Sequence, residues 1–163
     1  MFSCARKPCQ PSAFLQSGFY LLETMIVVTI LGIISFIAVP AYLHHIDRTN
    51  KVVAESDIVI IAESIERYYL EDMSYPNSLD DVGHGSKLDP WDNTYHYLRI
   101  AGANLKGKGS LRKDGSLNPV NSDYDLYSAG KDGQTKLTFR PMVSHDDIVR
   151  ASNGRFIGYA ADF

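Results

Sequence analysis

The chain has 163 residues, enough for one modest domain with its own core. Its 45% hydrophobic and 21% charged residues exclude a wholly disordered protein. The formal net charge of -3 gives no electrostatic reason to expect nucleic-acid binding.

Both cysteines, Cys4 and Cys9, lie ahead of residue 18, so no disulfide can join parts of the chain beyond it. No second Cys/His pair follows them at the spacing of a zinc site. We therefore expect two unpaired thiols.

Residues 19–43 are mostly apolar, and Glu23 is their only charged side chain. About 20 apolar residues can cross a bilayer as a helix. A removed secretory signal is the alternative, but its apolar core is only about 7–15 residues long. Arg6 and Lys7 precede the apolar run, so the positive-inside rule predicts a cytoplasmic N-terminus and a C-terminal part across the membrane.

Glu23 is unusual because a charged side chain at the centre of a membrane helix costs about 2.5–3.5 kcal/mol on insertion scales. Its place near the end of the run reduces that cost. On position alone, two interpretations stay open: a headgroup-boundary residue without a role, or a functional acid that needs a partner.

Pro40 lies late in the same run. A proline inside a helix removes one backbone hydrogen bond and clashes with the preceding turn, and in lipid the freed carbonyl needs another partner. Together with Gly32, it predicts a kink or local melting between residues 32 and 40.

The helical pattern continues from residue 43 to about residue 72, where YPNS (75–78) ends it. Its apolar stripe is predicted to pack on a small sheet and consists of Ile58, Ile61, Ile65 and Tyr68. His44 and His45 are adjacent, point to different helix faces and make a poor metal pair.

The remaining chain predicts short strands and loops. Alternation of bulky and polar residues predicts strands at the end of residues 88–97 and at 123–128, with turn chemistry at 92–93. Residues 102–121 predict an exposed loop or hairpin, and Asn153-Gly154 a turn before residues 156–159.

No catalytic motif is present: the chain has no HExxH, GxSxG, Walker loop or GxGxxG. Residues 107–110 (GKGS) are too short for a phosphate loop, and the remaining histidines are scattered. We therefore predict that the protein is not an enzyme.

Several features coincide at the N-terminus: a short basic leader ending in Gly18, then Phe19, an acid five residues after the glycine, and a late Pro40. Together they resemble the type IV pilin-like superfamily. The DPW motif (89–91), DYDLYSAGKDG (123–133) and the C-terminal DDIVRASNGRFIGYAADF are most similar to the major pseudopilins of type II secretion. The resemblance spans most of the chain.

The resemblance implies an α+β fold, with a long N-terminal hydrophobic helix packed on a small antiparallel sheet and a C-terminal loop. It implies a leader (1–18), a transmembrane and filament-core helix (19–43) and a periplasmic domain (44–163). A prepilin peptidase would cut between Gly18 and Phe19 and methylate the Phe19 amine. Glu23 would then pair with that amine on a neighbouring subunit and so set the register of assembly.

Major pseudopilins hold one calcium ion in the C-terminal loop. The matching ligands here would be the Ala129 carbonyl, the Asp132 carboxylate and Asp146, with Asp147 as the next candidate. Residues 134–143 (QTKLTFRPMV) depart from the family pattern because they contain no acid and two cations. The alternative is a turn at Asp132-Gly133 and a helix cap at 146–147 before Ile148.

The function implied is that of a structural subunit of a pseudopilus that helps export proteins across the outer membrane. Its partners would be copies of itself, minor pseudopilins, the prepilin peptidase, the inner-membrane assembly platform and lipid, with no nucleic acid. The expected location is the inner membrane, with one span. The alternatives are a type IV pilin of a surface pilus, for adhesion, motility or DNA uptake, and a membrane-anchored enzyme or binding domain.

Overall fold

The computed structural model describes residues 14–104 and 108–163, with side chains for residues 20–104 and 109–163. The chain divides into two units, residues 1–45 and 46–163. One helix, α1 (Phe14–Asp72), contributes to both. The candidate leader residues Cys4, Arg6, Lys7 and Cys9 lie outside the described residues.

Within the first unit, α1 continues without a break through Gly32 and Pro40. Local melting, one of the two outcomes expected at residues 32–40, is therefore wrong for the single chain. Pro40 removes one backbone hydrogen bond and its ring crowds the preceding turn, but the other backbone hydrogen bonds of the helix can still form around it. The hydroxyls of Thr24 and Thr29 donate to the carbonyls of Leu21 (3.0 Å) and Met25 (2.7 Å), which pairs these polar groups inside the apolar run.

Within the second unit, residues 46–72 of α1 present a buried stripe to the sheet. Ile58, Ile61 and Ile65 are fully buried, as predicted. Ala54 extends this stripe by one turn, whereas Tyr68 lies only half-buried and outside the core. The helix ends at Asp72, and Met73 follows in the left-handed region with φ 53, a usual way for a helix to stop.

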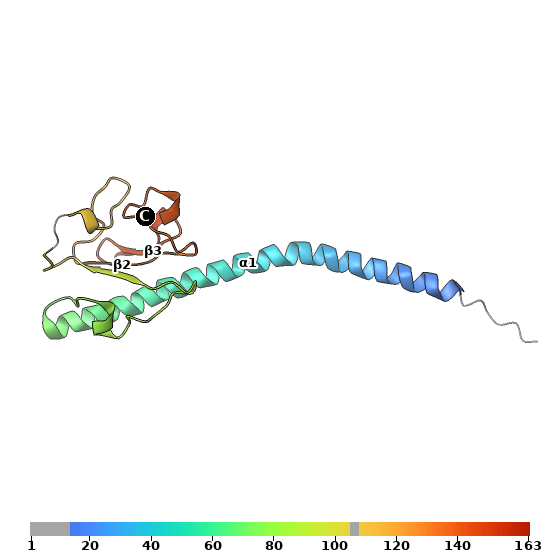
Figure 1. Cartoon of the computed structure of the whole chain (residues 1–163), viewed down its shortest axis with the longest axis horizontal. Helices are drawn as coiled ribbons and strands as arrows, with labels where there is room; N and C mark the ends of the chain where they lie inside the picture. Colours follow the sequence, from blue (N-terminus) through green and yellow to red (C-terminus); the bar gives the residue numbers. More distant parts are fainter. Residues whose placement is uncertain (1–13, 105–107) are drawn as a thin grey trace, which may run out of the picture. The chain divides into compact units, whose positions relative to one another are not determined.

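Four antiparallel strands form one sheet in sequence order, and they lie along this part of α1 (Figure 1). They are β1 (His96–Arg99), β2 (Tyr124–Ser128), β3 (Ile148–Ala151) and β4 (Phe156–Tyr159). The expected strands at the end of 88–97 and at 123–128 correspond to β1 and β2. Asn153-Gly154 forms the predicted turn, with both residues at positive φ.

Both faces of the sheet are covered. Alternate residues of one strand point to opposite faces, so Tyr124 and Leu126 of β2 face α1 while Tyr127 packs on a second cluster. That cluster is built from the loops and strands on the other face and contains Val120, Phe139, Val149, Ala151 and Ala160.

The covering loops correct one expectation. Within the exposed loop or hairpin predicted at 102–121, residues 115–119 are exposed, but Leu111, Arg112, Val120 and Asn121 are buried. Leu111 and Val120 are apolar and need cover, and the two polar side chains find buried hydrogen-bond partners.

Short 3-10 helices complete the unit: η1 (Leu79–Val82), η2 (Lys108–Ser110), η3 (Met142–Ser144) and η4 (Ala160–Asp162). The alternative of a helix capped by residues 146–147 is wrong, because Ile148 begins strand β3. As part of this strand, the Ile148 side chain is fully buried in the apolar core.

Candidate functional site

The described part of the first unit is an apolar helix segment with one acid. Side chains from Tyr20 to Leu43 are exposed, with Tyr20 at 72% and Phe36 at 83%. By length and composition, this helix is able to cross a membrane, with a mean hydropathy of 2.5 in its most apolar window. A helix that is apolar all round is stable when lipid or other protein surrounds it.

Glu23 lies on this segment and is exposed. Among the residues described by the structure, no hydrogen-bond or ion-pair partner contacts its carboxylate. Its immediate surroundings are apolar, and a hollow of about 340 Å³ beside it is lined by Tyr20, Thr24, Val27 and Val28. In lipid, a charge in such surroundings is costly unless an opposite charge pairs with it.

The predicted cleavage site lies in α1. The backbone of Gly18 and Phe19 is helical, and the Phe19 side chain lies outside the described part of the chain. The cut between them and methylation of Phe19 therefore stay predictions.

The loop after β2 brings two of the predicted calcium ligands, Asp132 and Asp146, into contact. Gly130 has φ 67, and a Cβ there would lie 2.3 Å from the Asp146 carbonyl oxygen, so only glycine allows this close approach. The Asp132 N–H donates to Asp146 Oδ2 at 3.1 Å. The carboxylate of Asp132 in turn accepts from the Gln134 N–H at 2.8 Å.

This arrangement does not fit a calcium ion. Calcium takes about 6–8 oxygen ligands; Asp132 and Asp146 each use one carboxylate oxygen to accept a backbone N–H, so the two acids supply far fewer ligands than that number. The next candidate, Asp147, is fully buried and pairs with the guanidinium of Arg112. Within residues 14–104 and 108–163, no group of three or more His, Cys, Asp or Glu side chains gathers where it could hold a metal ion.

A buried carboxylate links the DPW motif to the end of β2. Asp89 is 4% exposed, and its Oδ2 accepts the Ser128 hydroxyl. Asn93, from the same turn, donates to the Gly130 carbonyl at 2.9 Å. Both motifs carry the resemblance to major pseudopilins, but their contact is not visible in the sequence because 37 or more residues separate the partners.

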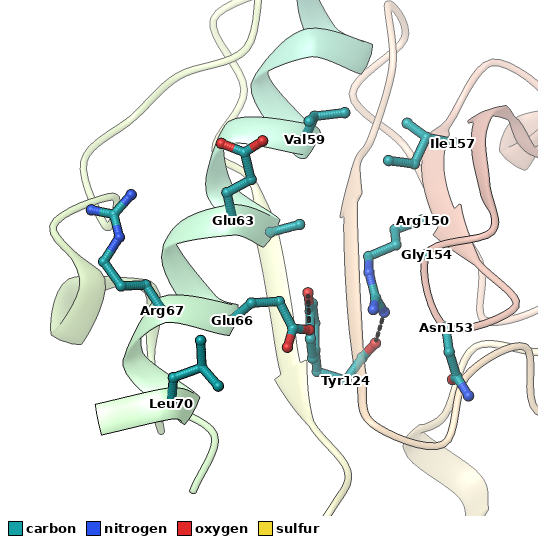
Figure 2. Close-up of a pocket in the computed structure, with 11 residues that line it drawn as sticks. Val59, Glu63, Glu66, Arg67, Leu70, Tyr124, Arg150, Asn153, Gly154 and Ile157 are labelled. Atoms are coloured by element: carbon teal, nitrogen blue, oxygen red, sulfur yellow. Dashed lines mark hydrogen bonds between the residues drawn. The ribbon is translucent and has the colours of Figure 1, made fainter. Parts of the chain in front are cut away.

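A groove of about 620 Å³ lies in the second unit between α1 and the sheet, and Figure 2 shows its lining. Glu66 from the helix and Arg150 from β3 both contact Tyr124. The Tyr124 hydroxyl lies 3.5 Å from Glu66 Oε1, and the Arg150 guanidinium lies 3.9 Å above the Tyr124 ring. Through these two contacts, Tyr124 links the Glu66 side chain of the helix to the Arg150 side chain of the sheet.

The architecture defines a class: a long helix that is apolar in its first part and carries a four-stranded antiparallel sheet on its second part is the pilin-like α+β fold. The chain is similar to "Type II secretion system core protein G" of Pseudomonas aeruginosa, with 32% identity over 73% of this chain and 86% of the relative. It belongs to the type II secretion system core protein G family.

Other relatives with the same name agree. The protein of Escherichia coli strain K12 is 31% identical over 82% of this chain and 90% of its own length. That of Dickeya chrysanthemi is 35% identical over 82% of this chain and 84% of its own length. No protein-family model matches the chain, and no solved structure matches it.

Proposed function

We propose that this chain is a structural subunit of a type II secretion pseudopilus, in which many copies assemble into a filament. The observation that carries the proposal is the likeness to core protein G over 73–82% of the chain in the relatives described above. The same likeness argues against a surface pilin and against a membrane-anchored enzyme or binding domain. The filament would support protein export across the outer membrane.

Lipid or protein must cover the exposed apolar surface of α1 both before and after assembly. In the inner membrane, lipid surrounds residues 20–43, with one span and a cytoplasmic N-terminus. In the filament, the same side chains pack against the helices of neighbouring copies. Because the segment is apolar on every face, it suits both environments, and transfer from one to the other exposes little apolar surface to water.

Cleavage by a prepilin peptidase between Gly18 and Phe19 would give Phe19 a positively charged amine. A Glu23 carboxylate about 4 Å from that amine on the next copy gains about 4 kcal/mol at an effective dielectric constant of 20. Each of the two charges costs about 2.5–3.5 kcal/mol in a membrane helix, so the pair costs about 5–7 kcal/mol. Pairing between copies therefore offsets more than half of that cost and favours one axial step over others.

Minor pseudopilins, the assembly platform of the inner membrane and the prepilin peptidase are the further partners proposed. Mass spectrometry of the protein purified from membranes tests the processing step directly. The expected result is a chain that starts at a methylated Phe19. An intact residue 1–18 leader in assembled filaments would contradict the proposal, as would normal protein secretion in cells that lack this subunit.

A further inference from the structure

Arg112 carries a positive charge into the interior beside the C-terminal loop. Its side chain is 3% exposed and that of Asp147 is 0% exposed. Arg112 Nη2 lies 2.5 Å from Asp147 Oδ2, and Nη1 donates to the Thr135 hydroxyl at 2.6 Å. The Thr135 hydroxyl in turn donates a hydrogen bond of 2.6 Å to Asp147 Oδ2. One cation thereby joins three segments that are distant in sequence.

Aromatic rings complete the surroundings of this charge. The guanidinium carbon lies 4.0 Å from the ring centroid of Tyr127 on β2 and 5.1 Å from that of Phe139 in the loop. A guanidinium stacks well on such rings, since the face of an aromatic ring carries partial negative charge. The sheet and the loop therefore both contact the cation.

The backbone of Arg112 is fixed as well. Its N–H donates to Asp125 Oδ2 at 2.9 Å, and the side-chain amide of Asn121 donates to Asp125 Oδ1 at 2.9 Å. Asn121 also donates to the Arg150 carbonyl on β3 at 2.9 Å. Buried groups of β2 and β3 thus fix the position from which the guanidinium reaches the loop.

We propose that the Arg112 guanidinium is the resident cation of residues 129–147, so that this chain closes its C-terminal loop without a metal ion. The loop itself supplies no acid between residues 134 and 143. The carboxylate that could complete a metal site, Asp147, neutralises Arg112 instead. Assembly of this protein is accordingly independent of calcium.

Charge repulsion supports this exclusion of a metal. Arg112 Nε and Asp147 Oδ1 each lack a hydrogen-bond partner within the described residues. The free oxygen could attract a small cation, but a divalent ion bound there would lie within a few ångströms of the guanidinium on the other oxygen. In a dry interior such like-charge contact is strongly unfavourable, so Arg112 and calcium exclude each other.

The test uses the full mature chain in detergent micelles, with thermal unfolding measured in excess calcium chloride and in excess EGTA. We expect the same Tm in both solutions and no binding of calcium by titration calorimetry. Chelation that lowers the wild-type Tm by several degrees, or binding of one calcium per chain, would overturn the proposal. This comparison decides the question even if no variant folds.

Variants test the role of the pair. Arg112→Met should lower the Tm by roughly 6–20 °C, because it leaves a buried carboxylate unpaired. Arg112→Met with Asp147→Leu should recover most of that loss. Lys131→Met is the matched control: it removes a cation of the same loop whose ion pair with Asp47 is 63% and 44% exposed, and it should shift the Tm by no more than about 4 °C. Equal shifts for Arg112→Met and the control would contradict the proposal.

Discussion

Asp89 accepts a hydrogen bond of 2.5 Å from the Ser128 hydroxyl, and both side chains are buried. The other oxygen of the same carboxylate accepts the backbone N–H groups of Trp91 at 3.0 Å and Asn93 at 2.8 Å. One carboxylate thus holds the turn before β1 against the end of β2. The loop that carries Asp132 begins directly after Ser128, so this contact also fixes where that loop starts.

Asp89→Asn should destabilise the second unit. An amide presents an NH₂ group where the carboxylate accepts donors, so at least one buried donor loses its partner, at a cost of about 2–4 kcal/mol. Urea denaturation of the detergent-solubilised chain measures this loss. Asp92→Asn is the matched control, because Asp92 is exposed and has φ 66, which asparagine tolerates. Its effect should stay within about 0.5 kcal/mol, and equal losses would refute the role of Asp89.

Glu23→Gln should reduce filament formation while leaving the fold of the monomer unchanged. The substitution keeps the shape of the side chain but removes the charge that the Phe19 amine of a neighbouring copy needs. Loss of only about 1.4 kcal/mol lowers an association constant tenfold, so filament yield in electron micrographs should fall by roughly that factor or more. Thr29→Val is the control, because the Thr29 hydroxyl bonds to its own helix. Filaments of Glu23→Gln at wild-type yield would be evidence against pairing.

The stability of the second unit should depend on pH through His96. Its ring stacks on Tyr127 at 4.8 Å, and desolvation lowers the pKa of His96 below its usual value, with the charge of Arg112 lowering this pKa further. The folded state then binds a proton less tightly than the unfolded state. Stability should therefore fall as pH drops below about 6.5 and through the lower folded pKa.

Unfolding experiments on both sides of about pH 6.5 check this direction, and His96→Gln should remove that part of the pH dependence. NMR titration of the His96 ring adds a second readout. In Arg112→Met, the pKa of His96 should rise, since a nearby positive charge is gone. An unchanged His96 pKa in that variant would show that the two charges do not interact.

Pro40→Ala should stabilise the backbone hydrogen bonds of α1 in its apolar part. Alanine restores a backbone donor for the carbonyl four residues earlier and removes a penalty of about 3 kcal/mol for proline inside a helix. Hydrogen–deuterium exchange of residues 36–44 in detergent should therefore become slower. Ala38→Ser is the control, with a small expected change because no backbone donor is gained. Faster exchange in Pro40→Ala would mean that the proline does not weaken the helix.

Local patterns determined much of the fold. The apolar run, the stripe of Ile58, Ile61 and Ile65, and the alternation in residues 123–128 each predict an element that the structure contains. These patterns are readable because helix and strand periodicities depend on neighbours within a few residues. The same is true of Glu23, whose lone charge in an apolar run is visible without any structure.

The tertiary structure alone decided what surrounds the loop after β2. The sequence shows Asp132, Asp146 and Asp147 but not that Arg112, 35 residues before Asp147, occupies the place of a counter-ion. It shows residues 102–121 as polar and therefore exposed, whereas Arg112 and Asn121 are buried by partners on β2 and β3. A buried charge is stable only when a partner of opposite charge meets it in space, and sheet pairing over long sequence separations sets which partner that is.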